Sequence, residues 1–213
     1  MTLPYPLVFL AHVDNTLLDN EQIQQDLRDH FEFIVGPASR VRYWQILEDL
    51  FGVLGYRDYI AALERYRIQY QREIERASLC SFLMFLMNYP FAAAVPWRAR
   101  SAEATARFRA HRASVEGATV FQPRKIERAG LVDAVEGRVS IYIHKGEVTD
   151  DIERRYPAER CVLIDNKLCI LDAIKEHWGE RVTTVFARRG PYVRDPYTST
   201  GFSRTRCDDQ SAC

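Results

Sequence analysis

The hydrophobic pattern of the chain differs between its first and second halves. Residues 7–13 form a short apolar run that leads into polar residues, as a buried strand does when it ends at the edge of a sheet. From about residue 21 to residue 87, apolar and aromatic side chains recur three and four positions apart, which predicts a series of amphipathic helices. Gly36, Gly52 and Gly55 are expected to separate these helices.

The second half alternates between strand and helix patterns. Residues 139–143, 161–164 and 182–186 are runs rich in β-branched residues, and each run predicts a strand. Between the last two runs, the amphipathic segment from Leu168 to His177 precedes Gly179 and predicts a helix with a glycine stop. Strands that alternate with helices form parallel sheets with helices on both faces. We therefore predict an α/β protein with a Rossmann-like parallel sheet and a helical insertion after the first strand.

The chain is expected to divide into an α/β core and a helical cap subdomain. The core takes residues 1–19 and 96–195, and the cap takes residues 20–95. Residues 196–213 are rich in Ser, Thr, Arg and Asp, a composition typical of a disordered tail. Residues 107–118 are too polar and basic for a central parallel strand, which is normally almost entirely apolar. Their arginines fit a solvated helix face better than a phosphate-binding patch.

Charge and hydropathy exclude several classes of partner. The 213 residues carry 29 basic and 29 acidic side chains, so the formal net charge is zero and favours neither nucleic acid nor an anionic membrane. No apolar stretch reaches the roughly 20 residues that span a bilayer. The first residues lack the basic and long apolar regions of a secretory signal. A cytoplasmic protein, either a monomer or a homodimer, is the expectation.

The first strand ends in a group of side chains suited to catalysis. Asp14, Asn15 and Thr16 place a carboxylate, an amide and a hydroxyl in consecutive positions directly after the apolar run. The alternative is a simple polar turn, because Asp and Asn favour turns. The segment resembles the first motif of the haloacid dehalogenase-like hydrolases, Asp-x-Asp-x-Thr, with one difference. His12 stands where that family has its nucleophilic aspartate.

The resemblance to this family implies the roles of several residues. Asp14 takes the position of the general acid and base, since residues two apart in an extended segment face the same side, and Thr16 takes that of the motif's threonine. Lys145, after a predicted strand, fits the lysine that steadies the phosphoryl charge. Ser114 is the nearest candidate for the phosphate-binding hydroxyl, and Asn15 is a second candidate for binding substrate.

A later motif of the family binds the metal ion, and here the chain reads Asp165-Asn166 where many relatives have two adjacent acids. The resemblance implies that Asp165, Asn166 and Asp14 would bind Mg²⁺, which prefers oxygen ligands. For Asp165 the alternative is a helix N-cap, and for Lys145 it is a solvated strand end. Further segments are similar to bacterial members of the family with a helical cap, namely residues 121–125, 183–186 and 190–192.

The function implied by the resemblance is Mg²⁺-dependent hydrolysis of a small organic phosphate. His12 is expected to impair it, because imidazole is a poor ligand for Mg²⁺ and cannot replace the attacking carboxylate, so that the metal is bound weakly or not at all. Two alternatives keep activity: His12 as an unusual nucleophile, or direct attack of water under catalysis by Asp14. A third is a non-catalytic regulatory protein that binds a phosphate ligand or a protein partner.

Overall fold

The computed structural model describes residues 5–71, 75–95, 111–116, 121–142, 154 and 157–190, with the backbone alone for 111–116 and 140–142. The described part contains a five-stranded sheet in which every pair of neighbouring strands is parallel. The strand order is β3-β2-β1-β4-β5, with the first strand at the centre. The strands are β1 (Tyr5–His12), β2 (His111–Glu116), β3 (Val139–Tyr142), β4 (Ala158–Asp165) and β5 (Val182–Phe186). The predicted α/β fold with a parallel sheet is confirmed.

The position of β2 corrects the expectation for residues 107–118. His111–Glu116 pairs with β1 on one side and β3 on the other, although its sequence, HRASVE, is polar. Strand pairing depends on backbone N–H and C=O groups, so a polar strand can pair when its neighbours hold it in register. Arg112 therefore belongs to a strand and not to a helix face, whereas Arg107 and Arg109 lie outside the described residues.

Helices fill the sequence between β1 and β2. They are α1 (Asn20–Val35), α2 (Pro37–Leu54), α3 (Tyr59–Gln69) and α4 (Arg76–Asn88), followed by the 3₁₀ helix η1 (Phe91–Ala94). Asp19 and Asp58 accept backbone N–H groups at the N-termini of α1 and α3. Gly36 and Gly55 follow the first two helices with φ of 85° and 76°, which side chains rarely adopt. Gly52 lies inside α2, so the break expected there is wrong.

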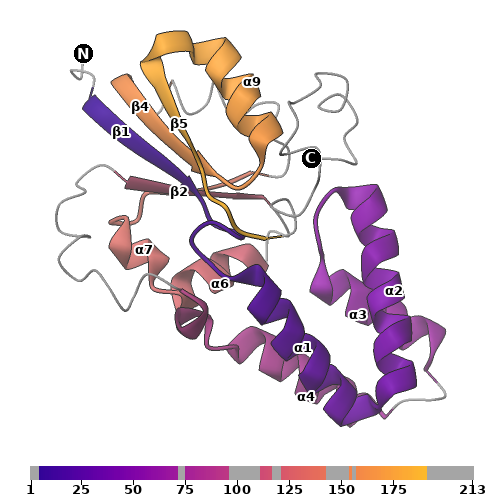
Figure 1. Ribbon diagram of the computed structural model, residues 1–213. Helices are drawn as coiled ribbons and strands as arrows, with labels where there is room; N and C mark the ends of the chain where they lie inside the picture. Colours follow the sequence, from indigo (N-terminus) through magenta and orange to yellow (C-terminus); the bar gives the residue numbers. More distant parts are fainter. Residues whose placement is uncertain are drawn as a thin grey trace.

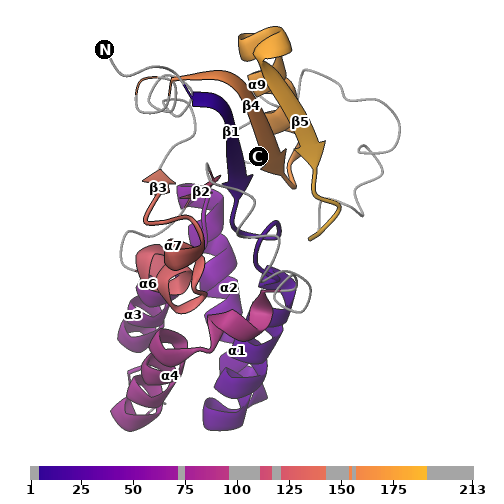
Figure 2. The ribbon, with the colours of Figure 1, turned by 90° about the vertical axis from the view of Figure 1, so that its left-hand side faces the viewer.

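Further helices of the described chain follow the strands β2 and β4 in the sequence. They are α6 (Phe121–Arg128) and α7 (Leu131–Ala134) between β2 and β3, and α9 (Leu168–Trp178) with the 3₁₀ helix η3 (Gly179–Arg181) between β4 and β5. Figures 1 and 2 show α9 beside β4 and β5, while α6 and α7 lie on the other side of the sheet, next to the bundle α1–α4. None of the described helices is long and apolar enough to cross a membrane.

Two buried apolar clusters hold the fold together. The smaller cluster joins β1, β4 and β5 to α9 through residues such as Leu10, Leu163 and Trp178. The larger cluster begins at Val13, continues through the bundle α1–α4 and reaches Leu131 at the start of α7. Because this cluster runs through both parts of the chain, the division into a core and a cap at residues 19/20 and 95/96 stays a prediction. The predicted tail, 196–213, lies outside the described residues.

Helix α6 connects the bundle to the sheet. Arg124 Nε donates to the carbonyl oxygen of Met87 at 2.7 Å, and Arg128 Nη2 donates to that of Asn88 at 3.0 Å. These arginines cap the carboxyl end of α4, where helix carbonyl groups lack partners within the helix. The ring of Phe121 lies 5.4 Å from that of Tyr59 on α3, centroid to centroid. The α6 helix is thus held against two helices of the bundle.

Candidate active site

The turn after β1 is wound tightly around one carbonyl oxygen. Val13 O accepts from the backbone N–H groups of Thr16, Leu17 and Leu18 at 3.3, 2.9 and 2.9 Å. Val13 and Leu18 are fully buried, which anchors the turn in the larger apolar cluster. Asn15 has a φ of 56°, a left-handed conformation that Asn tolerates better than most residues. The sequence after β1 therefore presents its polar side chains at the carboxyl edge of the sheet.

His12 and Asp165 face each other at the ends of neighbouring strands. Ala11 on β1 pairs with Ile164 on β4, so that the next residue of each strand lies at the same edge. The imidazole Nδ1 is 3.8 Å from Asp165 Oδ1, and the two residues are only 7% and 3% exposed. Asp165 Oδ1 accepts the backbone N–H of Lys167 at 2.9 Å, whereas the N-cap of α9 is Lys167 itself. Asp165 therefore faces His12 at the ends of the two strands and is not the N-cap residue of α9.

Asp14 is held by side chains from α6 and α1. Lys125 Nζ forms an ion pair with Asp14 Oδ1 and also donates to Asn20 Oδ1 at 2.8 Å. Gln122 Nε2 donates to Asp14 Oδ2 at 3.2 Å. Burial alone would raise the pKa of Asp14, but the charges of Lys125 and His12 and the two hydrogen bonds hold this pKa below its ordinary value of 3.8. Asp14 is therefore an ionised carboxylate with a fixed orientation.

Lys125, Gln122 and Asn20 are site residues that the sequence analysis missed. In the sequence, the segment 121–125 stands out by its resemblance to bacterial relatives and not by its chemistry. A signal was nevertheless present, because Gln122 and Lys125 lie on the same helix face as the buried Phe121 and Ile126. A lysine on the buried face of an amphipathic helix needs an acceptor, since charged side chains are rarely buried without a partner.

Of four further predicted site residues, the structure describes two with their side chains, one by its backbone alone and one not at all. Thr16 is 9% exposed and Asn166 is 1% exposed, and the side-chain oxygens of both lack a hydrogen-bond partner among the described residues. The backbone of Ser114 pairs with His12 on the adjacent strand, so β2 carries this serine to the same edge as the motif. Lys145 lies outside the described residues.

Asn15 is packed against Gly190, which follows β5 in the sequence. A Cβ atom added to Gly190 would lie 2.7 Å from Asn15 Cγ, closer than two such atoms can approach. Gly190 also has a φ of 75°, so both space and backbone conformation require glycine at this position. The close contact holds the Asn15 side chain at the mouth of the site.

A cleft of about 100 Å³ opens in front of these residues, and both the sheet edge and the helical bundle line it. Its walls are formed by His12, Asp14, Asn15, Asn20, Ile23, Gln24, Phe51, Gly55, Tyr56, Arg57, Tyr59, Phe121, Gln122, Lys125, Asn166 and Lys167. Arg57 is held in place by Glu48, to which its Nη2 donates at 3.0 Å, and by the Phe51 ring at 4.6 Å. The combination of apolar walls and converging polar groups is typical of a small-molecule site.

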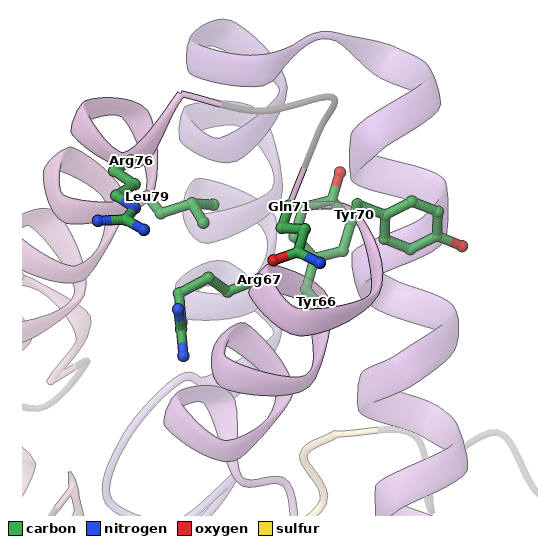
Figure 3. A pocket seen from close by; sticks show the side chains of 6 residues that line it. All are labelled: Tyr66, Arg67, Tyr70, Gln71, Arg76 and Leu79. Carbon is green, nitrogen blue, oxygen red and sulfur yellow. The ribbon is translucent and has the colours of Figure 1, made fainter.

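A second, smaller pocket of about 70 Å³ lies between α3 and α4 (Figure 3). It is lined by Tyr66, Arg67, Tyr70, Gln71, Arg76 and Leu79. Arg67 is exposed and paired with Glu64 on its own helix, as expected for a solvated surface pair. The described walls of this pocket contain no carboxylate, so the cleft at the sheet edge is the better candidate for a functional site.

The described side chains do not fit a magnesium site. No three His, Cys, Asp or Glu residues of the described chain are grouped so that they could hold a metal ion. The carboxylate of Asp14 is engaged by Lys125 and Gln122, and the second carboxylate, Asp165, faces an imidazole. Mg²⁺ requires several oxygen ligands in an octahedral arrangement. Asn166 Oδ1 is a buried oxygen without a hydrogen-bond partner among the described residues, but one amide oxygen does not supply the several oxygen ligands that Mg²⁺ requires.

Comparisons with known proteins give a consistent result. The chain is similar to the crystal structure of a haloacid dehalogenase-like hydrolase from Burkholderia xenovorans LB400, with 42% sequence identity and a TM-score of 0.82 over 98% of this chain and 96% of the other. A haloacid dehalogenase-like family hydrolase from Xanthomonas campestris covers 91% of this chain and 84% of its own with a TM-score of 0.57; at 19% identity it supports the fold alone. The sequence matches no protein-family model and no curated protein.

Proposed function

Because this chain belongs to the haloacid dehalogenase-like hydrolase family, we propose that it binds a small organic phosphate in the cleft at the sheet edge and hydrolyses it slowly at most. The family resemblance of the first motif assigns general acid and base chemistry to Asp14. It also assigns the first, attacking position to residue 12, which here is a histidine.

The single observation that carries the proposal is the environment of His12. The side chain is buried at the carboxyl end of β1 and its Nδ1 lies 3.8 Å from Asp165. A carboxylate at this position would attack phosphorus and would share a metal ion with Asp165, as the family resemblance implies. An imidazole removes both contributions at once. Losing the attacking group and a metal ligand together costs several kcal/mol of transition-state stabilisation, a loss in rate on the order of 10³-fold or more.

Asp14 is an ionised carboxylate in the resting site. Burial would raise its pKa, but the charges of Lys125 and His12 hold the pKa below its ordinary value of 3.8. An ionised carboxylate can act as a base at once, whereas it can protonate a leaving group only after it has taken up a proton.

Hydrolysis of an aryl phosphate tests this proposal. The natural protein, His12→Asp and His12→Asn are compared with p-nitrophenyl phosphate and Mg²⁺; the asparagine removes the imidazole without adding a carboxylate. We expect turnover with His12→Asp at least about 10³-fold above that of the other two proteins.

The other outcomes would contradict the proposal in different ways. Natural activity equal to that of His12→Asp would show that His12 does not impair catalysis. An acid-labile phosphoprotein would then identify His12 as the nucleophile, and its absence would favour direct attack by water. Inactivity of all three proteins would contradict the premise that the site is able to catalyse hydrolysis once residue 12 is an aspartate.

A further inference from the structure

We propose that the cleft is a metal-independent anion site, in which Lys125 and Lys167 hold a phosphoryl group beside His12 without a divalent cation. This inference rests on the proposed function and concerns how the same site binds its ligand. The described side chains of the cleft are not arranged to bind Mg²⁺, and an anion therefore has to be held by cationic side chains.

The charges on the cleft wall favour an anion. The described residues that line the cleft include three cationic side chains, Arg57, Lys125 and Lys167. The same set contains one carboxylate, that of Asp14. Since Arg57 is paired with Glu48 and Lys125 with Asp14, the wall as a whole carries no excess of negative charge. A divalent cation would enter a cleft in which the one carboxylate of the described wall already has a partner and the cationic side chains of that wall repel it at short range.

Asp165 does not change this balance, because it is shielded from the cleft. It is 3% exposed and is absent from the described cleft wall, whereas His12, which faces it, belongs to that wall. The backbone N–H of Lys167 takes up one lone pair of Asp165 Oδ1. The carboxylate is therefore turned toward His12 and the backbone of Lys167, and the described surface that meets a ligand is an imidazole and not a second carboxylate.

Lys125 is built to reach the ligand. Its side chain is 4% exposed, and its position is fixed by Asp14 and Asn20. An ammonium group has three N–H donors, and these two acceptors use two of them. The third remains for an oxygen in the cleft, where a charge-assisted bond to a phosphate is stronger than a neutral one. Lys167 lines the cleft next to Asn166 and contributes a second cationic side chain.

Isothermal titration calorimetry tests the inference with inorganic phosphate and with phenyl phosphate, each in EDTA and in excess Mg²⁺. For the natural protein we expect the same Kd in both buffers. For His12→Asp, in which residue 12 and Asp165 become adjacent carboxylates, we expect Mg²⁺ to tighten binding by about tenfold or more. Equal affinity for the two ligands assigns a site for the free anion. Tighter binding of phenyl phosphate assigns a site for an organic phosphate.

Two lysine variants and one control locate the anion. Lys125→Met and Lys167→Met are each expected to weaken phosphate binding about tenfold or more in EDTA. Lys175→Met is the matched control and should bind as the natural protein does. Lys175 lies on α9, outside the cleft wall, and donates to the carbonyl oxygen of Val182 on β5. Should Lys125→Met fail to fold, Lys167→Met carries the test.

The failures of the two proposals are distinguishable. Phosphate binding that requires Mg²⁺ in the natural protein would overturn metal independence and leave the proposed function standing. Unchanged binding by both lysine variants would overturn the placement of the anion. No binding in either buffer would overturn this inference together with the binding part of the proposed function.

Discussion

The ion pair between Lys125 and Asp14 joins the site to the packing of α6, and its removal should be costly. Lys125→Met keeps a long apolar side chain of similar length but removes the charge. The substitution leaves Asp14 with Gln122 as its remaining hydrogen-bond donor among the described side chains. It also removes the hydrogen bond to Asn20, the first residue of α1.

The burial of the two side chains sets the magnitude. Breaking a fully buried ion pair by removing one partner costs about 3–5 kcal/mol, whereas an exposed pair contributes about 0–1 kcal/mol. The side chain of Lys125 is 4% exposed and that of Asp14 is 20% exposed, so the carboxylate keeps some access to water. We therefore expect Lys125→Met to lower the free energy of unfolding by roughly 2–3 kcal/mol.

A double-mutant cycle in urea isolates the pair. Free energies of unfolding are measured for the natural protein, Lys125→Met, Asp14→Asn and the double variant. The lost bond to Asn20 is common to both lysine substitutions and cancels in the cycle. We expect a coupling energy of about 1.5–2.5 kcal/mol, within the range for contacting residues.

A matched cycle at Arg67 and Glu64 provides the control. This pair is also held by side chains alone, but its members are 47% and 56% exposed. Its coupling energy should be small and well below that of Lys125 and Asp14, because water screens exposed pairs on a helix. A coupling energy for Lys125 and Asp14 no larger than that of the control would refute the reasoning that burial makes this ion pair strong.

Three further predictions concern single groups. The pKa of Asp14 is lowered in the folded state, so its contribution to stability is complete above the ordinary value of 3.8 and is lost as pH falls through the folded pKa. The urea midpoint should therefore fall less between pH 6 and pH 3 for Asp14→Asn than for the natural protein. An equal fall in the two proteins would contradict this prediction. Gly190→Ala should lower Tm by several degrees, a loss of about 1–2 kcal/mol from the clash with Asn15 and the positive φ; an unchanged Tm would show that the contact yields freely. Asp58→Ala should cost about 1 kcal/mol in urea unfolding, because α3 loses its two N-terminal cap bonds; Asp58→Asn, a capping residue itself, should recover most of it.

Local patterns were sufficient for most elements of the fold. The β-branched runs at 139–143, 161–164 and 182–186 became β3, β4 and β5, and Leu168–Trp178 became a helix closed by Gly179. These segments have strong local preferences, and these preferences agree with the strands and the helix that the segments form. His111–Glu116 is the exception, because its pairing is imposed by β1 and β3 and not by its own composition.

The site was predictable only where a motif carries it. His12, Asp14, Thr16 and Asp165 stand in recognisable segments, and the structure brings His12 and Asp165 together at one sheet edge. Lys125 could not be paired with Asp14 from the sequence, because 111 positions separate them and no local pattern specifies such a contact. The structure describes Ser114 by its backbone alone, and Lys145 remains a prediction from the resemblance.

By itself, the sequence determined the parallel α/β fold and the helical insertion, and it predicts that His12 stands at the head of the first motif. Each of these depends on residues close together in the chain, where periodicity, turn residues and motif spacing act directly. Only the tertiary structure decided that Lys125 neutralises Asp14, that Asp165 lies behind His12, and that cations outnumber carboxylates on the described cleft wall. Charge balance in a cleft depends on which distant side chains meet and how far water is excluded from them, and packing alone sets both.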